Sequence, residues 1–295
     1  IIGKRLQAQV EFLRVFDPVS PVLADPSHGR YLDQIATSFQ NQTRDYLEGV
    51  ASSLRKDGLT VSSIVHEGYP ASFIVSEAER EPATLIAMST HGRSGITRWM
   101  LGSVSDKVLQ AVTTPLLIIR PRQQSLDPEV RLNSIIVPLD GSGISEQVLP
   151  HVSTLAKLLE LKVNLIMVTP SEIDYYQYAE NLAATYRDLS AKANADALDY
   201  LLSIKNRLEQ EGVRTVEERL LHGHPAEVIV DHAREVRDNF VAMTTHGHSG
   251  IGRWLLGSVA DRVVQGSGDP VLVIRARGYD ALSIEAEQPA RSKLM

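Results

Sequence analysis

A glycine-rich stretch that carries histidine and serine at fixed spacing occurs twice in this 295-residue chain. The first copy, THGRSGITRWMLGSV, covers residues 90–104, and the second, THGHSGIGRWLLGSV, covers residues 245–259. Glycine lets the backbone adopt positive φ and approach a ligand closely, so that successive N–H groups can converge on an anion. The residue types and their repetition therefore predict a phosphate-binding loop in each half.

A helical pattern follows each glycine loop. Ser103 with Asp106, and Ser258 with Asp261, predict an N-cap and an acidic residue at the third helical position. A helix that begins there adds N–H donors and the positive end of its dipole to the loop. The loop matches neither the P-loop spacing nor the dinucleotide-binding spacing of glycines.

Short apolar runs alternate with helical patterns in both halves, which predicts right-handed βαβ units and mainly parallel sheets. After a helix end in the first nine residues, we expect strands at 10–16, 60–66, 85–88 and 115–120, then at 134 to about 140, 163–168, 217–221, 240–243 and 270–275. We expect helices at 31–56, 72–80 and 227–237, after each glycine loop, and from the early 140s to about 159. The internal repeat predicts two tandem domains.

The composition excludes several classes of protein. With 43% hydrophobic and 22% charged residues, the chain has no apolar run long enough to cross a bilayer. A formal net charge of −6 disfavours a nucleic-acid partner. The absence of cysteine excludes disulfides, thiolate metal sites and a cysteine nucleophile. We therefore expect a cytoplasmic protein with no membrane or nucleic-acid partner.

The spacing Gly-x2-Gly-x9-Gly-Ser, with a histidine before the second position, resembles the nucleotide-binding signature of the universal stress protein family, in its ATP-binding subgroup. Gly92 and Gly247 match the second glycine of that signature, and the final Gly-Ser falls at 102–103 and 257–258. Ser89 and Thr244 occupy the first position, where the resemblance places the sugar of the ligand. The resemblance covers nearly the whole chain and makes it a tandem member.

The resemblance implies two flavodoxin-like α/β (HUP-class) domains, each with a mainly parallel five-stranded sheet flanked by helices. We expect the first domain at residues 1–121, a polar linker at 122–131, the second domain at 132–276 and a polar tail at 277–295. It also implies that the last strands of the two domains pair across a pseudo-twofold axis.

The first half has no counterpart of the unit that opens the second half, residues 134 to about 159. In the family's sheet the strand of that unit lies in the middle, so its absence leaves two unpaired strand edges in a buried core. We expect that the natural chain begins before Ile1. The alternatives are a domain that functions without this strand and a strand supplied by another chain.

Asp140, at the carboxyl end of an expected strand, is the best candidate ligand outside the glycine loops. Its carboxylate can accept a hydrogen bond from an adenine amino group or a ribose hydroxyl in the crevice where open α/β sheets bind ligands. The alternative is an N-cap for the next helix. The resemblance adds the backbones of Val168 and Val15 as contacts to the adenine edge, with a place in the strand core as the alternative.

The resemblance places the remaining contacts at strand ends and in the glycine loops. In the second half they are Pro138, Leu139, Met243, Thr244, His246, Gly247, Gly250, Gly257, Ser258, Val259 and Ala260. In the first half they are Met88, Ser89, His91, Gly92, Gly95, Gly102, Ser103, Val104 and Ser105. For the two helix-start serines, capping competes with phosphate contact. The loop histidines either bond a phosphate, orient the loop or only satisfy backbone groups, and we expect no metal site.

Catalytic motifs do not accompany the loops: a Ser-His-Asp context, a nucleophile elbow and a loop lysine are all missing. Tight binding without transition-state stabilisation gives little rate. We therefore expect a protein that binds ATP, with or without Mg²⁺. We also expect that nucleotide occupancy shifts this protein between partner-binding states in stress adaptation. The alternatives are a slow Mg²⁺-dependent ATP hydrolase and a nucleotide-independent scaffold. A homodimer and an unidentified protein partner are left open.

Overall fold

The computed structural model describes residues 1–16, 29–81, 84–89, 102–120, 131–171, 183–246 and 256–276, with backbone alone for 29–36 and 183–187. The fold is mixed α/β with mainly parallel sheets, as predicted. No helix in the described ranges is long and apolar enough to cross a membrane.

The second half forms a parallel sheet in which β5 (Ser134–Pro138) is the central strand. Its neighbours are β6 (Lys162–Thr169) and β8 (Asn239–Thr244), and the outer strands are β7 (Val216–His222) and β9 (Val271–Ile274). The helical elements are η3 (Ser145–Val148), α5 (Leu149–Leu159), α7 (Ala183–Gln210), α8 (Pro225–Glu235) and α9 (Ser258–Gly266).

Side chains of β5 alternate between two cores, as expected for a strand that is covered on both faces. Ile135 and Val137 pack in one cluster with residues of α5 and α7, whereas Ile136 packs in a second cluster with residues of α8 and α9. All three side chains are 0% exposed. The continuous apolar run in the sequence thus corresponds to a strand whose side chains are buried on both faces of the sheet.

The first half is built from α1 (Ile2–Arg5), β1 (Gln9–Phe16), α2 (Gly29–Lys56), β2 (Thr60–Glu67), α3 (Pro70–Ala78), β3 (Ile86–Ser89), α4 (Ser103–Ala111) and β4 (Leu116–Ile119). Strands β1 and β2 pair in a separate two-stranded parallel sheet, and β3 pairs with β4. Within the described ranges no strand lies between β1 and β3, where the second half has β5. The predicted absence of a counterpart of β5 is confirmed for these residues.

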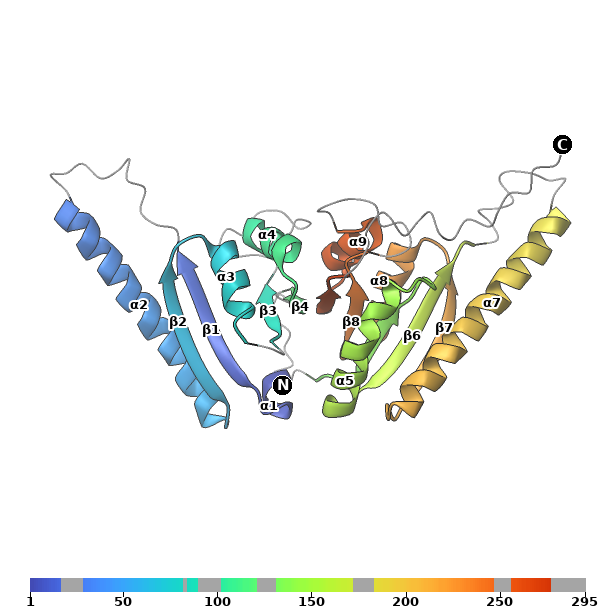
Figure 1. The fold of residues 1–295 in the computed structure, drawn as a ribbon, viewed down its shortest axis with the longest axis horizontal. Helices are drawn as coiled ribbons and strands as arrows, with labels where there is room; N and C mark the ends of the chain where they lie inside the picture. The colour runs from blue at the N-terminus through green and yellow to red at the C-terminus, as the bar shows by residue number, and fades with distance from the viewer. Residues whose placement is uncertain are drawn as a thin grey trace.

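The closing strands of the two halves pair with each other. Strand β4 runs antiparallel to β9, with Leu116 opposite Val273 and Ile118 opposite Val271. These four side chains are at most 2% exposed. The pairing joins β3 and β4 to the second half in one seven-stranded sheet, and α2 and α7 lie at the two ends of the molecule (Figure 1).

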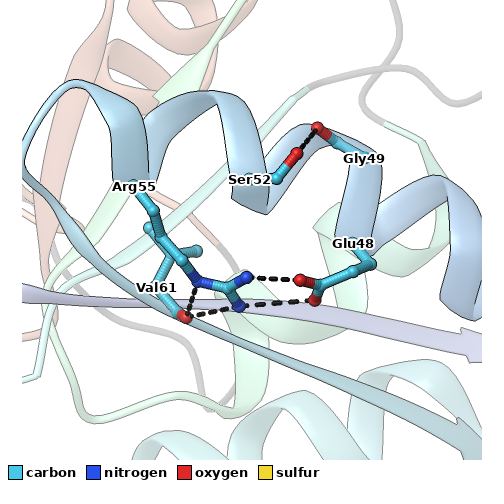
Figure 2. A network of polar contacts seen from close by, with 5 residues as sticks. All are labelled: Glu48, Gly49, Ser52, Arg55 and Val61. Carbon is cyan, nitrogen blue, oxygen red and sulfur yellow. Dashed lines mark hydrogen bonds and ion pairs between the residues drawn. The ribbon is translucent and has the colours of Figure 1, made fainter.

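Arg55 of α2 forms hydrogen bonds to the neighbouring strand β2 (Figure 2). Its Nε and Nη2 atoms donate to the Val61 carbonyl of β2 at 3.0 and 2.9 Å. Glu48, two turns earlier on α2, holds the guanidinium as an ion pair, and the hydrogen bond from Arg55 lowers the pKa of the Glu48 carboxyl. The Val61 carbonyl, with two lone pairs, therefore already accepts two donors.

Candidate functional site

The carboxyl ends of β5, β6 and β8 meet at one edge of the sheet because these neighbouring strands are parallel. Pro138 lies opposite Ile166, and the Leu139 amide donates to the Ile166 carbonyl at 2.9 Å. Strand β6 continues past this point through Val168, and β8 ends at Thr244. The structure therefore brings the predicted strand-end residues of the second half together.

Asp140 is exposed at this edge and organises the turn that leads into η3. Its Oδ1 atom accepts the Ser142 amide at 3.0 Å and the Ser142 hydroxyl at 2.6 Å. The Ser145 hydroxyl donates to the Ser142 carbonyl at 2.8 Å, and Gly141 adopts φ +81°, which favours glycine. Asp140 is therefore not the N-cap of the next helix, which was the alternative raised from the sequence, because the N-caps of η3 and α5 are Ile144 and Val148. It stabilises the turn before η3 instead, and a ligand contact stays a prediction.

Tyr200 of α7 supports the same turn, and the sequence analysis did not single it out. Its hydroxyl donates to Glu146 Oε1 at 3.3 Å, and Arg207 holds Glu146 Oε2 at 3.0 Å. Burial, followed by the negative charge of Glu146, raises the pKa of Tyr200 well above its usual value. Tyr200 follows Glu146 by 54 residues, so no local spacing signals the contact. The role of Ser142 was also missed, although Asp-Gly-Ser after a strand is typical of a turn and could have signalled it.

Gly257 lies very close to the end of β8. Its amide donates to the Thr245 carbonyl at 2.8 Å, and a Cβ atom on Gly257 would lie 3.2 Å from that oxygen and 3.6 Å from the His246 Cα. Glycine is required here by this approach and not by backbone angles, since Gly257 has φ −59° and Gly102 has φ −63°. Neither of these two glycines therefore uses the positive φ that glycine permits.

The predicted capping pairs are also wrong by one residue. Gly102 and Gly257 are the N-caps of α4 and α9, and their carbonyls accept the amides of Asp106 and Asp261 at 2.9 Å. Neither helix has a side-chain capping hydrogen bond. The two aspartates instead accept hydrogen bonds from glutamines one turn later, at 2.9 Å in α4 and 2.7 Å in α9.

Ser103 and Ser258 are consequently the first helical residues, and both are exposed. The extended glycine before each serine acts as the cap with its carbonyl, so the serine hydroxyl is displaced from the capping position. Neither serine therefore caps its helix, which was one of the two roles considered for them. Phosphate contact stays a prediction.

Thr244, at the first position of the glycine signature, turns its side chain into the protein. It is 4% exposed, and its Oγ1 atom donates to the His246 carbonyl at 2.6 Å. The next residue, Thr245, is hydrogen-bonded to β9, because its amide donates to the Ile274 carbonyl at 2.8 Å. The Thr245 hydroxyl also lies 3.1 Å from His246 Nδ1, which fixes the imidazole ring.

The buried candidates can contact a ligand only through their backbones. Leu139, Met243 and Ala260 are 4%, 7% and 3% exposed and belong to the two cores. Pro138 and Val259 are half-buried. Five loop candidates lie outside the described residues, namely His91, Gly92, Gly95, Gly247 and Gly250.

The first half brings together only part of its predicted site. Ser105, which follows Val104 in the first turn of α4, donates its hydroxyl to the Ser89 carbonyl at 3.0 Å, so that α4 lies against the end of β3 beyond Met88. Val15 belongs to β1, which is in the other sheet. The described residues of the first half therefore do not form the complete set of strand ends seen in the second half.

His222, at the end of β7, has ordinary hydrogen-bond partners. His222 Nδ1 lies 2.8 Å from the hydroxyl of Thr169, which donates to Asn194 Oδ1 at 3.1 Å. In the described part of the chain, no group of three or more histidine, aspartate or glutamate side chains could hold a metal ion.

Comparison with known proteins defines the class. The universal stress protein family model matches residues 2–120 and 132–275, and the chain belongs to this family. A universal stress protein of Methanocaldococcus jannaschii is 32% identical over 119 residues, which cover 40% of this chain and 69% of the relative. One of Mycolicibacterium smegmatis is 23% identical over 266 residues, covering 88% and 85%.

A solved structure shows the same fold along most of the chain. The universal stress protein of Archaeoglobus fulgidus superposes with a TM-score of 0.62 at 19% identity, and the match covers 91% of this chain and 86% of that one. The chain is thus a tandem member of the family, with two matched domains.

Proposed function

We propose that the second half binds an adenine nucleotide, ATP with or without Mg²⁺, and that occupancy regulates the protein in stress adaptation. The observation that carries the proposal is the contact between Gly257 and Thr245, which sets the start of α9 against the end of β8. The ends of β5 and β6 lie along the same edge. A helix start beside open strand ends is a typical place for a nucleotide in such folds.

The phosphates would lie at the start of α9. The first amides of a helix have no intrahelical acceptor, and no side chain caps them here. Amides of Ser258, Val259 and Ala260 can therefore donate to phosphate oxygens, and the exposed Ser258 hydroxyl lies beside them. Gly247 and Gly250 complete this part of the proposed site, together with His246.

The adenosine would lie between the ends of β5 and β6. Because β6 continues beyond the last partner of β5, the backbone at Val168 has no strand opposite it on that side among the described residues. Its peptide groups can pair with the adenine edge. The Asp140 carboxylate is held by its own turn, so it needs little reordering to accept an adenine amino group or a ribose hydroxyl.

The domain assignments belong to the same proposal. We propose domains at residues 1–121 and 132–276, a linker at 122–131 and a tail at 277–295, with β4 and β9 forming the interface of a pseudo-dimer. The second half is the better nucleotide site, since among the described residues only that half has three parallel strand ends beside the glycine-loop helix. The proposed location is the cytoplasm.

Thermal unfolding and product analysis together test this function. The full chain is heated with and without millimolar Mg²⁺–ATP, and ADP is quantified by chromatography after incubation at 25 °C. Binding without turnover predicts a higher melting temperature, since ligand at 100 times Kd adds about 2.7 kcal/mol, and no ADP above the protein-free control. ADP release that is lost in Gly257→Val would indicate a hydrolase, and an unchanged melting temperature would favour a scaffold.

A further inference from the structure

Two arginines occupy the same position of the internal repeat. Arg120 directly follows β4, and Arg275 directly follows β9. The spacing between them equals the spacing between the two glycine loops, which begin at residues 90 and 245. Both side chains are half-buried. Arg120 and Arg275 are therefore equivalent residues of the two halves, and each stands where a closing strand ends.

Each of these arginines donates a hydrogen bond to the glycine-loop helix of the opposite half. Arg120 Nη2 donates to the Gln265 carbonyl in the last turn of α9. Arg275 Nη1 donates to the carbonyl of Ala111, the last residue of α4, at 3.2 Å. The two helices lie toward the middle of the molecule, one in each half (Figure 1). The contact that the first half makes with the second is thus repeated by the second half with the first.

The strand pairing between the halves explains this exchange of contacts. Because β4 runs antiparallel to β9, a residue just past the end of one strand lies beside the turn that leads into the other. Ile118 lies opposite Val271, and the same register brings Arg120 beside Asp269. Residues 267–270 connect α9 to β9. The backbone of Arg120 therefore lies beside the C-terminal end of α9.

A guanidinium group suits this end of the helix. The last carbonyls of a helix have no intrahelical donor, and the helix dipole places partial negative charge there. Arg234, from the second half, donates to the neighbouring Gly266 carbonyl at 3.3 Å. Burial, followed by the charge of Arg234, lowers the pKa of Arg120, as expected for two cations at one helix end. The C-terminal end of α9 is thus held by one arginine from each half.

The other end of α9 is the proposed phosphate site. It is fixed by the Gly257 amide, which donates to the Thr245 carbonyl at 2.8 Å. The helix has 9 residues, so its two ends are only about 13 Å apart. A short helix that is held at both ends has a fixed axis, and its first amides point along that axis. A contact at the C-terminal end therefore influences where the first amides can meet a phosphate.

We propose that Arg120, a residue of the first half, is a positioning residue for the nucleotide site of the second half. It anchors the C-terminal end of α9 and thereby sets the direction in which the first amides of this helix face the phosphates. The inference rests on the proposed function for its ligand, whereas the anchoring of α9 does not. The site in the second half is then complete only while β4 and β9 are paired.

The same contact gives nucleotide occupancy a route to the first half. If pairing of the halves orders α9 for ATP, then bound ATP stabilises the contact of α9 with Arg120, because the coupling between two binding events is reciprocal. Arg120 thus assigns a physical element, α9, to the regulation that the proposed function requires.

Hydrogen exchange of the full-length chain without nucleotide tests the anchoring. Arg120→Met keeps an unbranched side chain but removes the charge and the donors. Exchange in the last turn of α9 should become about three- to ten-fold faster than in wild type, as expected for the loss of one hydrogen bond, while α4 is unchanged. Arg275→Met is the matched control, because it removes the equivalent contact. It should accelerate exchange in the last turn of α4 and leave α9 unchanged.

Calorimetric titration of the same variants with Mg²⁺–ATP tests the positioning. Affinity should fall about three- to ten-fold in Arg120→Met, in proportion to the loosening of α9. Arg120→Lys should recover an affinity within about two-fold of wild type, because an ammonium group still donates to a helix carbonyl. Arg275→Met should also stay within about two-fold of wild type, since its contact is with α4.

Three results would overturn the proposal. One is faster exchange of α4 and α9 together in either variant. Another is faster exchange of β4 and β9 in Arg120→Met, which would indicate a general loosening between the halves. The third is an Arg120→Met variant with a lower melting temperature but wild-type affinity for ATP, as a purely structural contact predicts. A wild-type chain that binds no ATP would refute the proposed function instead, and the exchange of α9 would then alone decide whether Arg120 anchors this helix.

Discussion

The Gly257 amide donates to the Thr245 carbonyl at 2.8 Å, so the start of α9 is held against the end of β8 by a backbone bond. A Cβ atom at Gly257 would meet the same carbonyl oxygen at 3.2 Å. This single contact links the two elements that the proposed phosphate site requires.

Gly257→Val should therefore destabilise the protein, because the valine side chain pushes α9 away from Thr245. Overpacking of this kind costs about 1–3 kcal/mol. Urea unfolding of the full chain measures the change. Gly268→Val is the matched control, since a Cβ atom there meets nothing within 4 Å, and its effect should stay below about 0.5 kcal/mol. Equal effects at both glycines would contradict the close approach at Gly257.

Two substitutions of Asp140 separate its structural role from its proposed ligand role. Asp140→Asn keeps an oxygen that can accept the Ser142 amide, whereas Asp140→Ala removes it. We expect Asn to leave the free energy of unfolding within about 0.5 kcal/mol of wild type and Ala to lower it by about 1 kcal/mol. Both should weaken ATP binding if the carboxylate contacts adenosine. An Asn variant with unchanged affinity would limit Asp140 to its turn.

Thr244→Val should loosen the segment after β8. The substitution keeps the shape of a 4% exposed side chain but removes the hydrogen bond to the His246 carbonyl, at a cost of about 1–2 kcal/mol. Denaturant unfolding measures this loss. The control is Thr154→Val, where an exposed hydroxyl donates to the Pro150 carbonyl of its own helix. A smaller loss at Thr244 than at Thr154 would contradict the assigned role.

Because of His232, the free energy of unfolding should decrease as the pH falls below about 6.5. The side chain is 6% exposed, and its Nε2 atom has no hydrogen-bond partner in the described structure. Burial and then the charge of Arg219 lower the pKa of His232, against the opposing effect of Glu235. The unfolded chain then binds a proton that the folded chain does not, so acidification favours unfolding.

Urea unfolding between pH 8 and pH 5.5 measures this dependence. His232→Leu should reduce the slope of stability against pH below about 6.5 and leave the behaviour above that pH unchanged. An identical slope in wild type and variant would show that His232 does not contribute.

Much of the fold was predictable because apolar periodicity is strong in both halves. The strand expected at 10–16 is β1 (Gln9–Phe16), and the closing strands expected at 115–120 and 270–275 are β4 and β9, each four residues long. Helix starts were less accurate. Pro70 and Pro225 begin α3 and α8 because proline fits the first helical position.

The details of the site depended on contacts that no local pattern specifies. Serine is favoured at N-caps, yet the extended glycine before each serine takes that position in α4 and α9. The approach of Gly257 to Thr245 and the contact of Tyr200 with Glu146 join residues far apart in sequence. That the described residues place no strand between β1 and β3 was predictable because the two halves of the sequence could be compared with each other.

Calorimetric titration of ATP with Mg²⁺ into the full-length chain tests the central claim most directly. The account predicts one saturable site per chain, with affinity at least ten-fold weaker in Gly257→Val and Asp140→Ala, a loss of about 1.4 kcal/mol or more, and unchanged in Gly268→Val. The absence of heat and of any thermal shift at millimolar ATP would contradict nucleotide binding by the second half.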